Sequence, residues 1–321
     1  MLRLCRGIIA STRTLGVKDP CGLCRSSSAP MGAISSERIE LSAKASGISR
    51  LRLEMTGGAG SRGSCTEALL ESIMTKVDAY RETLRTLGEW DAFLLEESGL
   101  PGRRANLELA NAVADEGDEE LFKRFLAFDA EQAPTNSPQE FLAFCGVLGL
   151  GRLLAEGDRA VLKLLHQHAC DPRWRIREAV AMALQRWGEV GLDALLQEME
   201  GWSEGNSLEQ RAALAALCEP GQLREAGQVE RVLMLLDAVT VSLEHVQNRQ
   251  SDEFKVLRKG LGYCWSVAVA AHPEAGKRMM ERWFASDDKD VLWVMKENLK
   301  KKRLARMDAE WVAASKRRLG M

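Results

Sequence analysis

The segment Asp171–Glu189, DPRWRIREAVAMALQRWGE, constrains the fold more than any other part of this chain. Apolar side chains recur 4, 7, 8 and 11 residues after Ile176, a spacing that places them on one face of an α-helix. Asp171 and Pro172 predict an N-cap followed by a first-turn proline, and Gly188 predicts the C-cap. Because such a helix has one apolar face, it must be covered by neighbouring helices.

Related patterns recur along the chain. Arg177-x-Ala179-x-Ala181-x-Ala183 is echoed 34 residues later by Arg211-x-Ala213-x-Ala215, and fainter echoes start at Ser251 and at Asp287. Upstream, helical hairpins are predicted around Gly117 (helices over 103–114 and 119–128) and around Gly157 (helices over 141–154 and 159–168). An opening helix is predicted over Thr66–Glu97, with Leu69, Ile73, Val77, Tyr80 and Leu84 on one stripe. Units repeating every 34 to 47 residues or so are typical of helical solenoids.

The pattern of Asp171–Glu189 resembles the second helix of a HEAT repeat. That helix has a capping Asp-Pro, an aliphatic residue followed by Arg, and then Ala and Leu, which match Asp171-Pro172, Ile176-Arg177 and Ala183-Leu184. The resemblance implies an all-α fold of the armadillo type, a right-handed α-α superhelical solenoid of HEAT-like helical hairpins. We expect about five or six helical pairs over residues 66–321.

Composition agrees with an all-α chain. Aromatic residues make up 6% and charged residues 28%, a balance that favours helices over strands. The net charge of −2 is unevenly placed, because residues 1–65 carry +6 and residues 296–321 carry +6, which leaves −14 for residues 66–295. No run of about 18 apolar residues predicts a membrane-spanning helix, so we expect no membrane partner.

Residues 1–65 predict a disordered basic tail that ends in a Gly/Ser-rich linker. Residues 1–36 have the basic, Ser-rich composition of a mitochondrial transit peptide. The alternative is that the chain starts further on, at Met31 or Met55, so it stays open whether residues 1–54 are part of the mature protein. The expected location is the cytoplasm, or the mitochondrion if residues 1–36 act as a transit peptide.

Candidate binding residues follow from the resemblance, since the second helix of each HEAT pair lines a concave groove. They are Arg173, Trp174, Arg175, Arg177, Arg211, Lys255, Arg258 and Lys259. Trp174 stands between two arginines and is a candidate binding hot spot. For Arg177 and Arg211, the regular position within the repeat favours a structural role, in which the arginine pairs with an acidic group of an adjacent repeat.

The C-terminal segment is the densest cationic feature, with Lys300, Lys301, Lys302 and Arg303 in one run. A run of this kind is either a solvated helix or a site for a polyanion. The region of Trp283, Asp290, Trp293, Asn298 and Lys300 faintly resembles a helical pair of the DNA alkylation repeat proteins, which hold damaged duplex DNA in a basic groove. An acidic body is a poor host for DNA, so this remains the alternative.

No motif for catalysis or for a cofactor is found. Gly-x-Ser-x-Gly, the P-loop and His-Glu-x-x-His are absent, and Cys21-x-x-Cys24 lacks a second ligand pair, so we expect no enzyme activity, cofactor or metal. The leading hypothesis is a non-catalytic HEAT-like scaffold or adaptor that binds a protein or peptide on its concave surface. The alternative is a nucleic-acid binding protein or DNA glycosylase. The sequence does not indicate the oligomeric state.

Overall fold

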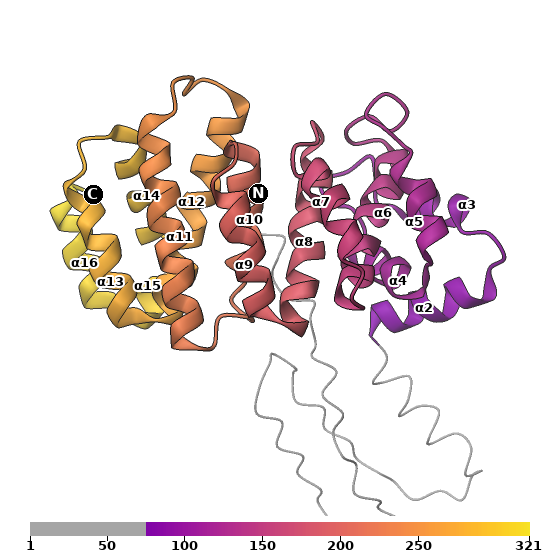
Figure 1. Ribbon diagram of the computed structural model, residues 1–321, viewed down its shortest axis with the longest axis horizontal. Coiled ribbons are helices and arrows are strands. Elements are labelled where there is room, and N and C mark those ends of the chain that lie inside the picture. Colours follow the sequence, from indigo (N-terminus) through magenta and orange to yellow (C-terminus); the bar gives the residue numbers. More distant parts are fainter. Residues whose placement is uncertain (1–74) are drawn as a thin grey trace, which may run out of the picture. The chain divides into compact units, whose positions relative to one another are not determined.

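The computed structural model describes residues 75–321, and all regular structure within this range is helical (Figure 1). The all-α prediction is therefore confirmed for these residues. The predicted tail and linker of residues 1–65, the alternative starts and the beginning of the opening helix lie outside the described residues. None of the helices in the described part is long and apolar enough to cross a membrane.

Seven helices form what we call the main row, in which each helix packs against the next one named. They are α2 (Lys76–Thr86), α4 (Leu107–Glu116), α6 (Pro138–Ala155), α8 (Trp174–Val190), α10 (Ser207–Leu217), α12 (Asp252–Ala271) and α14 (Lys289–Leu299).

Five further helices form the cover row. They are α5 (Glu119–Leu126), α7 (Leu162–Ala169), α9 (Leu192–Ser203), α11 (Ala226–His245) and α13 (Pro273–Arg282). The first four pack against the main-row helix that follows each of them, and α13 packs against α12. Figure 1 shows this alternation from the indigo end to the yellow end of the described chain. The remaining elements are α3 (Asp91–Glu97), the 3-10 turns η2 (Arg159–Val161) and η3 (Trp283–Ala285), α15 (Lys302–Met307) and α16 (Ala309–Arg318).

A single apolar core runs between the two rows, from Leu84 to Val312. Trp187 and Trp265 are buried in it, whereas Trp283 and Trp293 are only partly buried. Helix α6 is buried on all sides from residue 140 to 151, because α4, α5 and α8 pack around it.

The predicted helical hairpins are present, but several helix boundaries differ from the prediction. Helix α4 begins at Leu107 rather than at residue 103, and α6 begins at Pro138 rather than at residue 141. Helix α8 begins after Arg173 rather than after Asp171, because the Asp171 carboxylate accepts the Arg173 N–H within the turn and does not cap the helix. Gly188 lies inside α8, and the C-cap is Gly191. Glycine suits position 188 because a Cβ there would lie only 2.6 Å from Gln222 Oε1.

The opening helix is not continuous. Within its described part, α2 ends at Thr86 and α3 begins at Asp91. Leu87 is in the extended conformation, and its N–H donates to the Leu84 carbonyl at 3.2 Å. The same carbonyl also accepts the indole N–H of Trp90 at 3.0 Å, which links the start of α3 to the end of α2. The apolar stripe in the sequence ends at Leu84, before this break, and does not reveal it.

Small residues let the main-row helices approach closely. A Cβ on Gly151 of α6 would lie 2.5 Å from the Cα and 2.7 Å from the carbonyl oxygen of Ala183 in α8. Backbone atoms cannot move aside as a side chain can, so this glycine sets the distance between the two helices.

We expect Gly151→Ala to destabilise the protein by about 1–3 kcal/mol, because overpacking outweighs the gain in helix propensity. The control is Gly201→Ala in α9, where a Cβ meets nothing within 4 Å. This change should raise the stability by up to about 1 kcal/mol. Urea unfolding followed by circular dichroism measures both, and equal effects of the two changes would contradict the close packing of α6 on α8.

Candidate functional site

A shallow hollow lies where the main-row helices α8, α10 and α12 meet. Its lining is made of carboxylates, an amide, an aromatic ring and small apolar groups: Glu178, Ala181, Gln185, Ala215, Cys218, Glu219, Tyr263 and Cys264. Positions 178, 181 and 185 share one face of α8 because they are three and four residues apart. The hollow has room for about one water molecule, so it can receive part of a side chain but cannot enclose a substrate.

Amide side chains join the helices around this hollow. Gln185 Nε2 donates to the Ala215 carbonyl at 2.8 Å, and Gln222 Nε2 donates to the Gln185 carbonyl at 2.6 Å. The Gln222 Oε1 atom is buried and accepts no hydrogen bond from residues 75–321. Gln222 is not part of the lining of the hollow, so this atom is not open to a partner there.

The ionisable groups of the hollow are partly desolvated. Burial raises the pKa of Glu219, whose Oε1 accepts one N–H, from Gly221 at 3.4 Å. Burial also raises the pKa of Tyr263, against the effect of Arg303, which donates to the Tyr263 hydroxyl at 2.6 Å. The Arg303 guanidinium lies 4.5 Å from the centre of the Tyr263 ring. Because Glu219 accepts only this one N–H from residues 75–321, its carboxylate can accept further hydrogen bonds.

Three of the arginines expected on the binding surface are buried. Arg173, Arg175 and Arg211 are 3%, 4% and 6% exposed. All three guanidinium groups are engaged with other parts of the fold, so none of them can offer a surface to a partner. The expectation of a groove-facing role is thus corrected for these residues.

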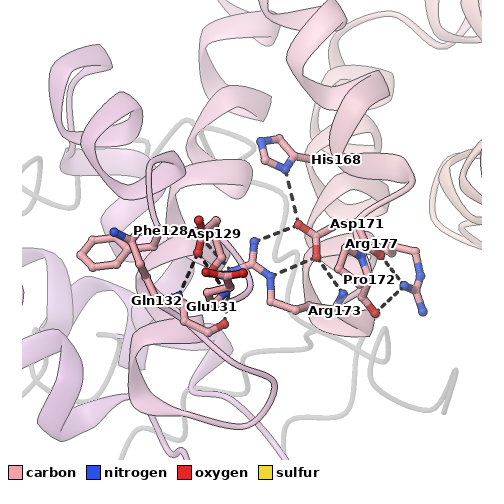
Figure 2. A network of polar contacts seen from close by, with 10 residues as sticks. Phe128, Asp129, Glu131, Gln132, His168, Asp171, Pro172, Arg173 and Arg177 are labelled. Atoms are coloured by element: carbon pink, nitrogen blue, oxygen red, sulfur yellow. Dashed lines mark hydrogen bonds and ion pairs between the residues drawn. The ribbon is translucent and has the colours of Figure 1, made fainter.

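Arg173 joins the start of α8 to the segment that follows α5 (Figure 2). Its guanidinium donates to Asp171 Oδ2 at 2.8 Å and to the carbonyls of Phe128 and Asp129 at 2.9 and 3.0 Å. His168 Nδ1 lies 3.8 Å from the same carboxylate. Although burial opposes ionisation, the nearby His168 imidazole and the hydrogen bonds from Arg173 outweigh it and hold the pKa of Asp171 well below its usual range.

Arg175 and Arg211 each tie α8 to a neighbour in the main row. Arg175 donates to Glu140 of α6 at 3.0 Å and to the Gly102 carbonyl at 2.7 Å. Arg211 of α10 donates to Glu178 and, at 2.9 Å, to the Arg177 carbonyl. Arg211 thus pairs with an acidic group of the adjacent helical pair, as the structural interpretation predicts.

Arg177 and Arg258 are also held, although both are partly exposed. Arg177 donates to the Asp171 carbonyl and to the Pro172 carbonyl, so its partners are backbone groups of its own turn rather than an acidic side chain. Arg258 of α12 pairs with Asp290 of α14 and lies over the Trp293 ring at 4.5 Å.

The other expected binding residues are more accessible. Trp174 is half-buried, with the Arg175 guanidinium 4.4 Å from its ring centre. Lys255 is half-buried beside Asp252 at 3.4 Å, and Lys259 is exposed.

The four cations of the C-terminal run do not act as one patch. Lys300 and Lys301 both pair with Glu297, and Arg303 is held by Tyr263. Lys302 is exposed and makes no ion pair within residues 75–321. The run therefore contributes less exposed positive charge than its sequence suggests.

Several residues that carry the resemblance to DNA alkylation repeat proteins make contacts within the fold. Asp290 is buried and accepts from Arg249 and Arg258. Asn298 is fully buried and bonds to the backbone of Ser266 and Leu261. The Trp283 indole donates to Asp237 at 2.9 Å. These side chains are not brought together around an open groove.

No group of three or more His, Cys, Asp and Glu side chains among residues 75–321 is placed to hold a metal ion. His166 packs edge-on against Trp202, with ring centres 4.7 Å apart. Cys145, Cys218 and Cys264 are buried free thiols, whereas Cys170 is exposed. No protein-family model, no curated protein and no solved structure matches this chain.

Gln185, Glu219 and Tyr263 of the hollow were not among the candidates from the sequence. A signal for them exists in the small residues Ala181 and Ala215, which occupy matching places in the two clearest repeats and leave space between the helices. The repeat pattern draws attention to the arginines instead, because they recur most regularly.

We expect Asp171→Asn to destabilise the protein at pH 7 by about 2–4 kcal/mol, because it removes the charge that partners the buried Arg173. A carboxyl with a lowered pKa stabilises the folded state above its unfolded pKa, and this contribution is lost as the pH falls through the folded value. The difference from the unmodified protein should therefore shrink once the pH falls below about 4. Urea unfolding at several pH values measures it.

The matched control is Asp287→Asn, at an exposed aspartate for which we expect a change within about 0.5 kcal/mol. A difference for Asp171→Asn that stays constant down to pH 2.5 or so would contradict the lowered pKa.

Proposed function

We propose that residues 75–321 form a HEAT-like α-solenoid that binds a protein or peptide, without catalysis, at the hollow of α8, α10 and α12. The main row and the cover row support the solenoid, since helices from successive pairs stack side by side as in repeat proteins. The observation that carries the binding proposal is the hollow itself. It is shared by three consecutive main-row helices and combines polar groups with small apolar ones.

The chemistry of the hollow suits a polypeptide partner. The Glu219 carboxylate can accept N–H donors, and a polypeptide offers such donors in its backbone and in its Lys and Arg side chains. Tyr263, held by Arg303, adds a rigid aromatic surface of the kind that often dominates binding energy. A site too small to enclose a substrate favours a binding surface over an active site.

Nucleic acid is a second candidate partner, favoured by exposed cations near the C-terminus. Besides Lys302, the side chains of Arg306, Arg317 and Arg318 are exposed. Binding of this kind would be electrostatic and would weaken steeply with added salt. No buried carboxylate in this region remains available for glycosylase chemistry, because Asp290 is held by two arginines.

We expect Glu219→Lys in the full chain to weaken capture of protein partners at least tenfold, which corresponds to about 1.4 kcal/mol. The reason is that the change reverses the charge of the hollow and removes its free acceptor. The measurement is affinity capture from cell extract with quantitative mass spectrometry, after nuclease treatment. Circular dichroism checks that the variant keeps its helices.

The control is Glu96→Lys, which makes the same charge change at an exposed position of α3. It should capture the same partners as the unmodified chain. Equal capture by the Glu219→Lys chain would refute the hollow as the binding surface. Loss of all capture upon nuclease treatment would instead support the nucleic-acid candidate.

A further inference from the structure

Two buried thiols in the described part of the chain line the same opening. Cys218 is the C-cap of α10 and Cys264 lies inside α12, and both contribute to the hollow of α8, α10 and α12. They are 3% and 1% exposed. The other cysteines of residues 75–321 belong to other helices, Cys145 buried in α6 and Cys170 exposed at the end of α7. The fold therefore brings together two thiols from neighbouring main-row helices.

Both cysteines are held at the same carbonyl group. The Leu214 carbonyl of α10 accepts the Cys218 N–H at 2.9 Å, and the Cys264 thiol donates to the same oxygen at 3.6 Å. The Cys264 sulfur thus reaches from α12 to the last turn of α10, which Cys218 ends. Because Cys218 is followed by no further helical turn, its backbone can move slightly to bring the two sulfurs to bonding distance.

The surroundings of the thiols set their reactivity. Burial raises the pKa of Cys218 well above its usual value, and the neighbouring Cys264 thiol raises it further. Of the charged groups nearby, Arg303 lowers this pKa and Glu219 raises it. Because the thiolate is the form that attacks an oxidant, the pair reacts slowly at neutral pH and persists as free thiols until an oxidant reaches it.

We propose that Cys218 and Cys264 form an intramolecular disulfide when the protein meets hydrogen peroxide, and that this bond fixes α10 to α12 at the hollow. An opening with room for about one water molecule excludes bulky oxidants. A peroxide can still react there, because only one of its oxygen atoms has to touch a sulfur in the lining. The disulfide closes the chain between residues 218 and 264 into a loop, which lowers the entropy of the unfolded state.

The reaction is a two-electron oxidation of the pair of sulfur atoms. The thiolate of one cysteine attacks a peroxide oxygen, so an S–O bond forms, the O–O bond breaks and the departing hydroxide takes up the thiol proton to become water. The second thiol then attacks the sulfenic sulfur, forms the S–S bond and releases the sulfenic oxygen as water. Two thiols and one hydrogen peroxide thus yield one disulfide and two water molecules.

This device goes beyond the proposed function and does not rest on it. The disulfide needs no partner, so failure of the capture experiment would leave it unchanged. Failure of the disulfide to form would equally leave the binding proposal unchanged, because Glu219→Lys alters neither thiol.

The test is treatment of the folded, fully reduced full chain with hydrogen peroxide at low protein concentration. Remaining thiols are then blocked with N-ethylmaleimide in urea, and tryptic peptides are analysed by mass spectrometry. Each of the two cysteines is alone in its tryptic peptide, residues 212–224 and residues 260–277. We expect these two peptides to be joined, with a mass two hydrogen atoms below their sum. Oxidation of the exposed Cys170 shows that the peroxide was effective.

Thermal unfolding tests whether the bond fixes the two helices. Oxidation should raise the midpoint by at least about 4 °C, and dithiothreitol should reverse the rise. Cys218→Ala and Cys264→Ala should each abolish the rise. The matched control is Cys145→Ala, the same change at a buried cysteine outside the hollow, which should keep it. Each variant is compared with its own reduced form, so a loss of stability caused by the substitution does not affect the comparison.

Oxidation of Cys170 with residues 212–224 and 260–277 still separate would overturn the proposal. Joined peptides that appear only when the protein is treated in urea would also overturn it, since the fold would then not bring the thiols together. Joined peptides without a rise in the midpoint would refute the fixing of α10 to α12.

Discussion

Buried and half-buried arginine–carboxylate pairs between neighbouring main-row helices are the interaction on which this structure depends. Arg175 joins α8 to Glu140 of α6, Arg211 joins α10 to Glu178 of α8, and Arg258 joins α12 to Asp290 of α14. Apolar faces alone would let adjacent helices slide or rotate, because the hydrophobic effect is non-directional. A buried ion pair, by contrast, tolerates only one alignment, since a misaligned pair leaves charges buried without partners.

This use of arginine also shapes the surface. The guanidinium groups that recur along the sequence are engaged in contacts within the fold. The hollow of α8, α10 and α12 is therefore lined by amide, carboxylate and phenol groups. The surface proposed for binding is therefore less cationic than the repeat pattern implies. Positive charge is also paired near the C-terminus, where Lys300 and Lys301 both form ion pairs with Glu297.

The helices of this fold could be predicted well from the sequence, and their contacts less well. Helical periodicity and the glycines at 117 and 157 indicate the hairpins, because both are local properties of the chain. The break between α2 and α3 depends on the Trp90 indole, and the start of α8 depends on how Arg173 reaches Asp171. Such side-chain bonds are set by tertiary placement, so no periodic pattern reveals them.

The contacts of the candidate site were also only partly predictable from the sequence. A role for Arg211 in joining helical pairs could be inferred from its regular position, whereas burial of Arg173 and Arg175 could not. Their partners, the Phe128 carbonyl and Glu140, are more than 30 residues away in the chain. The hollow was missed for a related reason, because Gln185, Glu219 and Tyr263 come from three helices and form no motif in any one of them.

A double-mutant cycle on Arg211→Met and Glu178→Gln tests most directly whether buried pairs hold the main row together. The free energy of unfolding would be measured for the unmodified chain, both single variants and the double variant. We expect a coupling energy of at least about 2 kcal/mol, with the double variant more stable than the sum of the single losses implies. Additive losses, with a coupling below about 0.5 kcal/mol, would contradict it.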